Sequence, residues 1–150
     1  MQINISGYKR ELLYRKAQGK MHQEAYVNKI QSFIGVAVDT NKFLDLEATD
    51  RIINELKARE IKSKQRVDIS NYKDLIFFIK EKVGHSFFYL LIDEEWKFCG
   101  AYKSTKPLSE KYNFDKLCSD EIRITSCDLS FQIQIDYEHS EIECEYIEYK

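Results

Sequence analysis

The feature that most constrains the fold is a regular alternation of apolar and polar residues near the C-terminal end. Apolar residues occupy every second position in two stretches, namely Phe131, Ile133, Ile135 and Tyr137, then Ile142, Cys144 and Tyr146. A period of two is typical of antiparallel strands that have one face on the core and the other in water. We therefore predict two strands that pair through a turn at Glu138-His139-Ser140.

The rest of the C-terminal half also predicts strands and helices. The apolar run Phe87–Ile92 has the length of a buried strand, and a turn at Asp93-Glu94-Glu95 leads into a second arm, Trp96–Tyr102. Other expected elements are short strands at 67–69 and 122–125, a helix at 71–83 and a short helix at 109–118.

The N-terminal half has a helical period. Apolar residues three or four apart predict a helix that starts at Tyr8 and ends at Gly19, a second at 22–34 and a third at 47–61. The charged run Lys62–Arg66 is a candidate linker. We predict an α+β fold in which a helical segment, 1–62, precedes an antiparallel sheet with flanking helices, 67–150, as two units or as one continuous core.

The two halves differ in charge. Residues 1–66 hold 13 basic and 8 acidic residues, whereas residues 67–150 hold 10 basic and 17 acidic ones. The halves therefore carry net charges of +5 and −7, which suggests separate partners or attraction between them.

The predicted C-terminal hairpin collects acidic residues on its polar face. No Lys or Arg occurs between Asp128 and Tyr149. This face is either an ordinary solvated surface or a binding surface, and we favour binding because like charges across paired strands destabilise a sheet. A basic protein is the natural partner. The predicted contacts are Asp136, Glu138, Glu141, Glu143 and Glu145, with Tyr146 and Tyr149 as aromatic anchors.

The sequence contains no recognisable enzyme motif. It lacks a Gly-rich phosphate loop, a Gly-x-Ser-x-Gly turn and paired histidines on a helix. The four cysteines lack metal-ligand spacing, and we expect reduced thiols and no cofactor. Magnesium ligation by Asp136, Glu138, Glu141 and Glu143 in a metal-dependent hydrolase is the weakest alternative, because alternating acids on an exposed strand point into water.

The N-terminal helix suggests a nucleic-acid alternative. Its basic residues could contact phosphates while the adjacent Tyr8 and Tyr14 stack on bases; they are Lys9, Arg10, Arg15, Lys16 and Lys20. The acidic C-terminal half and a pI near 6.0 argue against this interpretation.

We expect no membrane association. The longest stretch without Asp, Glu, Lys or Arg is Val83–Ile92, about half of a spanning helix. The first ten residues also lack the apolar region of a signal peptide, so the expected location is the cytoplasm.

Two segments resemble known families. Residues 8–60, in particular Tyr26 and the run Phe43–Lys57, resemble a helical module of phage-encoded regulatory and DNA-transaction proteins. The C-terminal half, in particular Asp120–Phe131 leading into the acidic strands, is similar in style to bacterial immunity proteins, which neutralise secreted or contact-delivered toxins. The second resemblance implies a non-enzymatic protein that binds and occludes a cognate toxin, often a basic nuclease. The first implies a phage or mobile-element regulator that binds nucleic acid.

Overall fold

The computed structural model describes residues 7–106 and 108–150, which form an α+β fold, as predicted. The helices are α1 (Gly7–Ile34), the short 3-10 helix η1 (Thr40–Lys42), α2 (Leu46–Ala58), α3 (Tyr72–Val83), α4 (Trp96–Cys99) and α5 (Phe114–Leu117). The strands are β1 (Ile61–Val67), β2 (Phe88–Ile92), β3 (Tyr102–Ser104), β4 (Glu121–Ser126), β5 (Phe131–Glu138) and β6 (Glu141–Tyr149).

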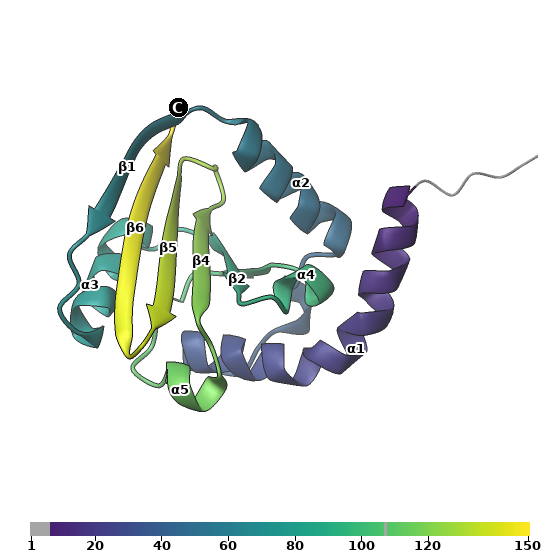
Figure 1. Cartoon of the computed structure of the whole chain (residues 1–150), viewed down its shortest axis with the longest axis horizontal. Helices are drawn as coiled ribbons and strands as arrows, with labels where there is room; N and C mark the ends of the chain where they lie inside the picture. Colours follow the sequence, from purple (N-terminus) through teal and green to yellow (C-terminus); the bar gives the residue numbers. More distant parts are fainter. Residues whose placement is uncertain (1–6, 107) are drawn as a thin grey trace, which may run out of the picture.

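These strands form one antiparallel sheet in the order β1-β6-β5-β4-β2-β3 (Figure 1). The predicted turn between β5 and β6 is confirmed, and Glu138 lies directly opposite Glu141. The two residues between them, His139 and Ser140, have φ angles of 51° and 64°. Positive φ at both central residues is the requirement of a type I′ turn, whose twist matches that of the flanking strands. The turn therefore fixes the register of the hairpin.

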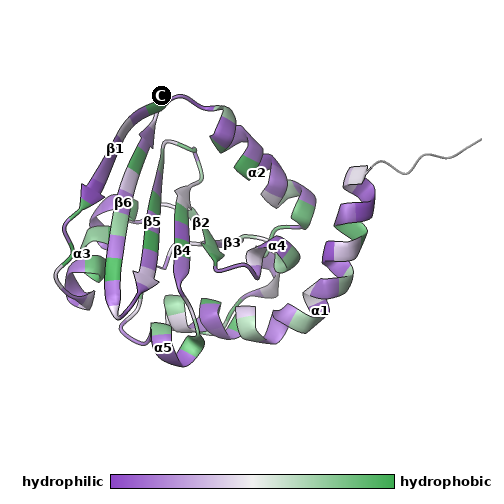
Figure 2. Ribbon diagram, viewed as in Figure 1, coloured by the Kyte–Doolittle hydropathy of each residue, from purple (hydrophilic) through white to green (hydrophobic). Residues whose placement is uncertain are grey.

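One face of the sheet carries the hydrophobic core, and Figure 2 shows the alternation as coloured bands along β5 and β6. Two apolar rows cross the central strands: Leu90, Ile124, Ile133 and Tyr146, and then Ile92, Ile122, Ile135 and Cys144. These residues form one buried cluster with Tyr26, Ile30 and Phe33 of α1 and with Leu75, Ile76 and Ile79 of α3. Residues from both sides of the predicted linker thus contribute to one core.

The predicted helix break at Gly19 is wrong, because α1 continues to Ile34. A Cβ atom on Gly19 would lie 2.8 Å from the carbonyl oxygen of Phe98. The glycine therefore allows the backbones of α1 and α4 to approach closely, and it does not end the helix. Figure 1 shows that α1 bends along its length, with its first part beside α4.

The predicted linker Lys62–Arg66 is also wrong, because this run forms most of β1 and pairs with β6. The prediction failed because the run has no apolar face. β1 lies at the edge of the sheet, where charged residues protect against pairing with other chains. The third predicted helix accordingly ends at Ala58, before this strand begins.

Two further predictions need correction between residues 93 and 118. The expected second arm of a hairpin is interrupted by α4, and only Tyr102–Ser104 pair with β2. The short helix expected at 109–118 is limited to Phe114–Leu117. Ser109 instead bonds to α1, with its N–H 2.7 Å from the oxygen of Phe33. Tertiary contacts therefore override the local pattern in this segment. The helix at 71–83 and the strands at 87–92 and 122–125 agree with the prediction within one residue at each end.

In the described part of the chain, no helix combines the length and the apolar character needed to cross a membrane.

Candidate functional site

The five predicted acidic contacts lie together on the face of the sheet opposite the core rows. Cross-strand pairing places Asp136 opposite Glu143, Gln134 opposite Glu145 and Glu138 opposite Glu141. All five carboxylates therefore project from the same side of the β5–β6 hairpin. We call the residues Glu121, Asp136, Glu138, Glu141, Glu143 and Glu145 the acidic face.

Glu121 of β4 is a member that sequence reasoning missed. It pairs with Asp136, so Glu121, Asp136 and Glu143 form a row of three acids across three neighbouring strands. Partial burial and the charges of Glu121, Glu143 and Glu145 raise the pKa of Asp136, although Arg123 opposes the shift. The sequence could have revealed it, because extending the predicted strand at 122–125 by one residue places Glu121 on the polar face.

Bases that are distant in the sequence partly compensate this charge. Arg66 of β1 lies 3.2 Å from Glu143, and Lys64 lies 3.6 Å from Glu145. Arg123 lies 2.7 Å from Glu121 on its own strand. The segment 128–149 lacks a base in sequence, but β1 and β4 supply three in space. Among the described residues, Asp136 and Glu141 have no ion-pair partner.

The two predicted aromatic anchors are not part of the acidic face. Tyr146 lies on the core side, where its ring contacts Phe78 and Phe131. Tyr149 is on the same side as the glutamates but stands at the opposite end of β6, and burial raises its pKa. The structure therefore brings together the carboxylates and separates them from both tyrosines.

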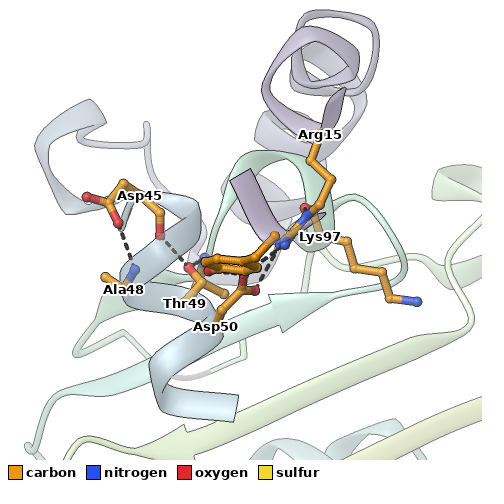
Figure 3. Close-up of polar contacts among 8 residues, drawn as sticks. Arg15, Asp45, Ala48, Thr49, Asp50 and Lys97 are labelled. Atoms are coloured by element: carbon orange, nitrogen blue, oxygen red, sulfur yellow. Dashed lines mark hydrogen bonds and ion pairs between the residues drawn. The ribbon is translucent and has the colours of Figure 1, made fainter. Parts of the chain in front are cut away.

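Arg15, one of the five basic residues predicted to contact phosphates, is engaged inside the protein. Its guanidinium bonds to both carboxylate oxygens of Asp50 at 2.8 and 2.9 Å, and its Nε bonds to the carbonyl oxygen of Lys97 at 2.6 Å (Figure 3). Burial alone would raise the pKa of Asp50, but hydrogen bonds from Arg15 and Tyr8 lower it. Arg15 thus connects α1 to α2 and α4. Lys9, Arg10, Lys16 and Lys20 remain exposed on α1.

This ion pair lies in a groove of about 570 Å³ between α1, α2 and α4. Aromatic residues line much of the groove, among them Tyr8, Tyr14, Trp96 and Phe98. The tyrosine hydroxyl of Tyr8 donates to Asp50 at 2.7 Å, and this bond raises the pKa of Tyr8 to about 12. The groove was not predictable from sequence, because its walls come from three segments that are far apart in the chain.

Next to this groove, hydrogen bonds and a close backbone approach hold the start of α2 against the segment that follows α4. Asp45 caps α2 by accepting from the N–H of Ala48 at 2.7 Å (Figure 3). The hydroxyl of Thr49 donates to the carbonyl of Asp45 and accepts from the N–H of Ala101. Gly100 has φ of 90°, and a Cβ there would lie 2.0 Å from the oxygen of Leu44. These contacts hold α2 and α4 in a fixed position relative to each other, so we assign the junction a role in the fold.

A second buried ionic cluster joins α1 to the sheet. Lys29 bonds to Asp93 at 2.7 Å and to Glu95, and all three side chains are largely buried. Asp93 also accepts from the N–H groups of Asp120 and Glu121. Burial opposes its ionisation, but these bonds lower the pKa of Asp93. Lys29 is thus the cation that compensates two buried carboxylates, and its removal would leave both without an ion-pair partner.

Among residues 7–106 and 108–150, no group of three or more His, Cys, Asp or Glu side chains is placed to hold a metal ion. The acids considered as magnesium ligands, Asp136, Glu138, Glu141 and Glu143, are therefore spread across the hairpin face without forming a coordination site.

Comparison with known proteins gives no family assignment, because no protein-family model, curated protein or solved structure matches the chain significantly.

Proposed function

We propose that this protein is an immunity protein whose acidic face binds and occludes a basic bacterial toxin, for which a nuclease is the best candidate class. The row of Glu121, Asp136 and Glu143 carries the proposal. Like charges placed directly opposite each other reduce sheet stability. A basic partner would remove this repulsion on binding, so the unfavourable arrangement in the free protein becomes a source of affinity.

The acidic face is suited to fast recognition. Glu143 and Glu138 have side chains that are 60% and 83% exposed, so a partner can reach them without rearrangement of the chain. Clustered charges of one sign steer an oppositely charged protein and raise its association rate. The hairpin that carries them is fixed by the type I′ turn and by the apolar rows on its other side.

The proposal does not require an active site in this chain. Its partner would be inhibited because the acidic face covers the basic surface that holds the partner's own substrate. The exposed ion pairs of Arg66 and Lys64 contribute little stability, and their carboxylate partners can be shared with incoming bases. We expect a cytoplasmic, non-enzymatic protein that needs no cofactor.

The partner can be identified by expressing the tagged chain with its neighbouring reading frames and analysing the captured proteins by mass spectrometry. We expect one stoichiometric basic protein that is toxic when expressed alone and harmless when coexpressed. Capture of nucleic acid or of a host transcription protein instead would contradict the immunity function and support the regulator alternative, in which Lys9, Arg10, Lys16 and Lys20 bind nucleic acid.

The role of the acidic face can then be tested with the triple variant Glu138→Lys, Glu141→Lys and Glu143→Lys. We expect association with the captured partner to slow by about tenfold or more at low salt, because steering is lost. A matched control, Glu24→Lys, Glu55→Lys and Glu81→Lys, makes the same change in net charge at exposed positions outside the acidic face. Equal slowing by both triple variants, or by neither, would remove the acidic face from the interface.

A further inference from the structure

A pocket of about 450 Å³ lies at the end of the sheet opposite the acidic face. The end of α3, β3 and the β4–β5 turn form its walls, which include Lys82, Phe87, Lys103, Cys127, Asp128 and Phe131. Strand register places it far from the acids, because Phe131 begins β5 and Glu138 ends it. A ligand bound in this pocket would therefore not contact the acidic face.

Two lysines, Lys82 and Lys103, line this pocket, and a third, Lys42, lies beside the ring of Phe87. The ammonium groups of Lys103 and Lys42 lie 4.9 and 5.5 Å from the ring centroid of Phe87. That of Lys82 lies 4.6 Å from the ring of Tyr146. Within the described ranges, none of the three lysines makes an ion pair. Their ammonium groups lie against aromatic rings, a contact that is weak at solvent-accessible sites. An anion would be a stronger partner.

The pocket also offers a flat apolar surface. Phe87 is 45% exposed, whereas phenylalanine side chains are usually buried in the core of a protein. Phe131, which is partly buried, lines the same pocket. A ligand that carried only negative charge would leave this surface in contact with water.

One wall of the pocket is a hydrogen-bond acceptor. The carboxylate of Asp128 is held by the N–H and hydroxyl of Ser130 at 3.0 and 2.7 Å. This fixed negative group would repel a purely acidic peptide. It would accept bonds from a ligand that has hydroxyl or amino donors as well as an anionic group.

We propose that this pocket binds a nucleotide unit, either free or as part of a single-stranded nucleic acid. Lys82 and Lys103 would pair with the phosphate, the base would stack on Phe87, and Asp128 would accept from ribose or base donors. Stacking on an exposed aromatic ring beside cationic side chains is the general chemistry of such recognition. The pocket is separate from the acidic face, so this proposal does not depend on the toxin partner.

Binding can be measured by calorimetry on the full chain with adenosine monophosphate, adenosine, inorganic phosphate, an oligo(dA) strand and a polyglutamate peptide. We expect saturable binding of the monophosphate, and at least about tenfold weaker binding of adenosine and of phosphate, because each satisfies half of the site. Comparable binding of the monophosphate and the strand indicates a free nucleotide, and binding of the strand alone indicates a nucleic acid. Both results support the proposal. Saturation by polyglutamate alone, or by no probe, overturns it.

Cys127 provides a readout at the site itself. This thiol is partly buried in the pocket, whereas Cys118 is exposed elsewhere. Peptide mapping after alkylation should show that the bound probe protects Cys127 and leaves the modification of Cys118 unchanged. Unchanged modification of both thiols at saturating probe would place binding outside the pocket and contradict the assignment.

Variants separate the two parts of the site. Lys82→Gln with Lys103→Gln should weaken nucleotide binding by at least about tenfold, and should reduce the salt dependence for a strand by about 0.7 per lysine. Phe87→Ala should weaken binding by about 5- to 150-fold, and Phe87→Leu retains side-chain bulk if the alanine variant unfolds. Lys62→Gln with Lys73→Gln is the charge-matched control at exposed positions. Equal effects of the two lysine pairs would overturn the proposal.

Discussion

Charged residues in the α1 contacts and charged residues on the acidic face are arranged in opposite ways. Arg15 and Lys29 are buried, and each forms a hydrogen-bonded ion pair, Arg15 with Asp50 and Lys29 with Asp93. On the acidic face, Asp136 has acids on both sides across the strands. The first arrangement pairs each buried charge within the chain, whereas the second places the Asp136 carboxylate between two other acids.

The pKa shifts give the same contrast. Hydrogen bonds lower the pKa of Asp50 and Asp93 in spite of burial, so ionisation of these two groups favours the folded state. Burial and neighbouring acids raise the pKa of Asp136, so its ionisation disfavours the folded state. Charges of the first kind favour the folded state, and those of the second kind are the ones to which we assign the proposed binding role.

The largest effect should come from Lys29→Met. This variant leaves Asp93 and Glu95 buried without their cation, and removing one partner of a buried ion pair costs about 3–5 kcal/mol. We expect urea denaturation to show a loss of this size, whereas the exposed control Lys73→Met should change the free energy of unfolding by less than about 0.5 kcal/mol. A loss below about 1 kcal/mol would mean that the cluster is not a stabilising element.

The same cluster predicts the response to acid. Because the folded pKa of Asp93 is lowered, its contribution to stability is complete above the unfolded value, about 3.9, and is lost as pH falls through the folded value. Thermal melts between about pH 5 and pH 2 should therefore show a smaller decrease for Lys29→Met than for the unmodified protein, because the variant has already lost the bond that lowers this pKa. Parallel decreases would contradict the assignment.

The next largest effect is expected for Arg15→Lys. A lysine keeps the charge but cannot bond to both oxygens of Asp50 and to the carbonyl of Lys97 at once. We expect a loss of about 1–2 kcal/mol in the free energy of unfolding, with faster hydrogen exchange in the first turns of α1. Tyr8→Phe, which removes one exposed hydrogen bond to the same carboxylate, is the control and should have a smaller effect. Equal stability of Arg15→Lys and the unmodified protein would show that the bonds of the guanidinium to Asp50 and Lys97 do not stabilise the fold.

The same contrast explains what the sequence could predict. The alternation in 131–149 predicts the two strands, the turn between them and their polar face, because all three are determined by residues that are close together in the sequence. The sequence instead predicts a linker for the segment that contains the compensating bases Lys64 and Arg66, because this edge strand has no apolar face. The contact between Arg15 and Asp50 joins residues 35 positions apart, and no local period encodes it. Gly19 illustrates the same limit, because its role depends on the carbonyl of Phe98.

The candidate site divides in the same way. The five carboxylates could be placed on one face because strands alternate, but the position of Tyr146 was mispredicted as part of that surface. It follows Glu145 directly, so the same alternation places it on the core side, where it contacts Phe78. The pocket around Phe87 depends on three separate elements, and its lysines are isolated from one another in the sequence. Surfaces within one hairpin are therefore predictable, whereas those assembled from several elements are not.

The smallest effect has the opposite sign and provides the sharpest test of the comparison. Asp136→Asn removes the central charge of the acidic row while retaining the shape of the side chain. We expect the free energy of unfolding at pH 7 to increase by about 0.2–1 kcal/mol, the range for cross-strand pairs. The control Glu55→Gln, at an exposed position on α2, should have no such effect.

The increase in the free energy of unfolding of Asp136→Asn should become smaller at low pH. Because the folded pKa of Asp136 is raised, its unfavourable charge is present above that pKa and disappears as pH falls through it. The difference between Asp136→Asn and the unmodified protein should therefore shrink in acid, while the stability contributed by Asp50 and Asp93 is being lost. If the variant is instead less stable at pH 7, Asp136 is satisfied within the chain like Asp50, and the acidic row no longer indicates a partner.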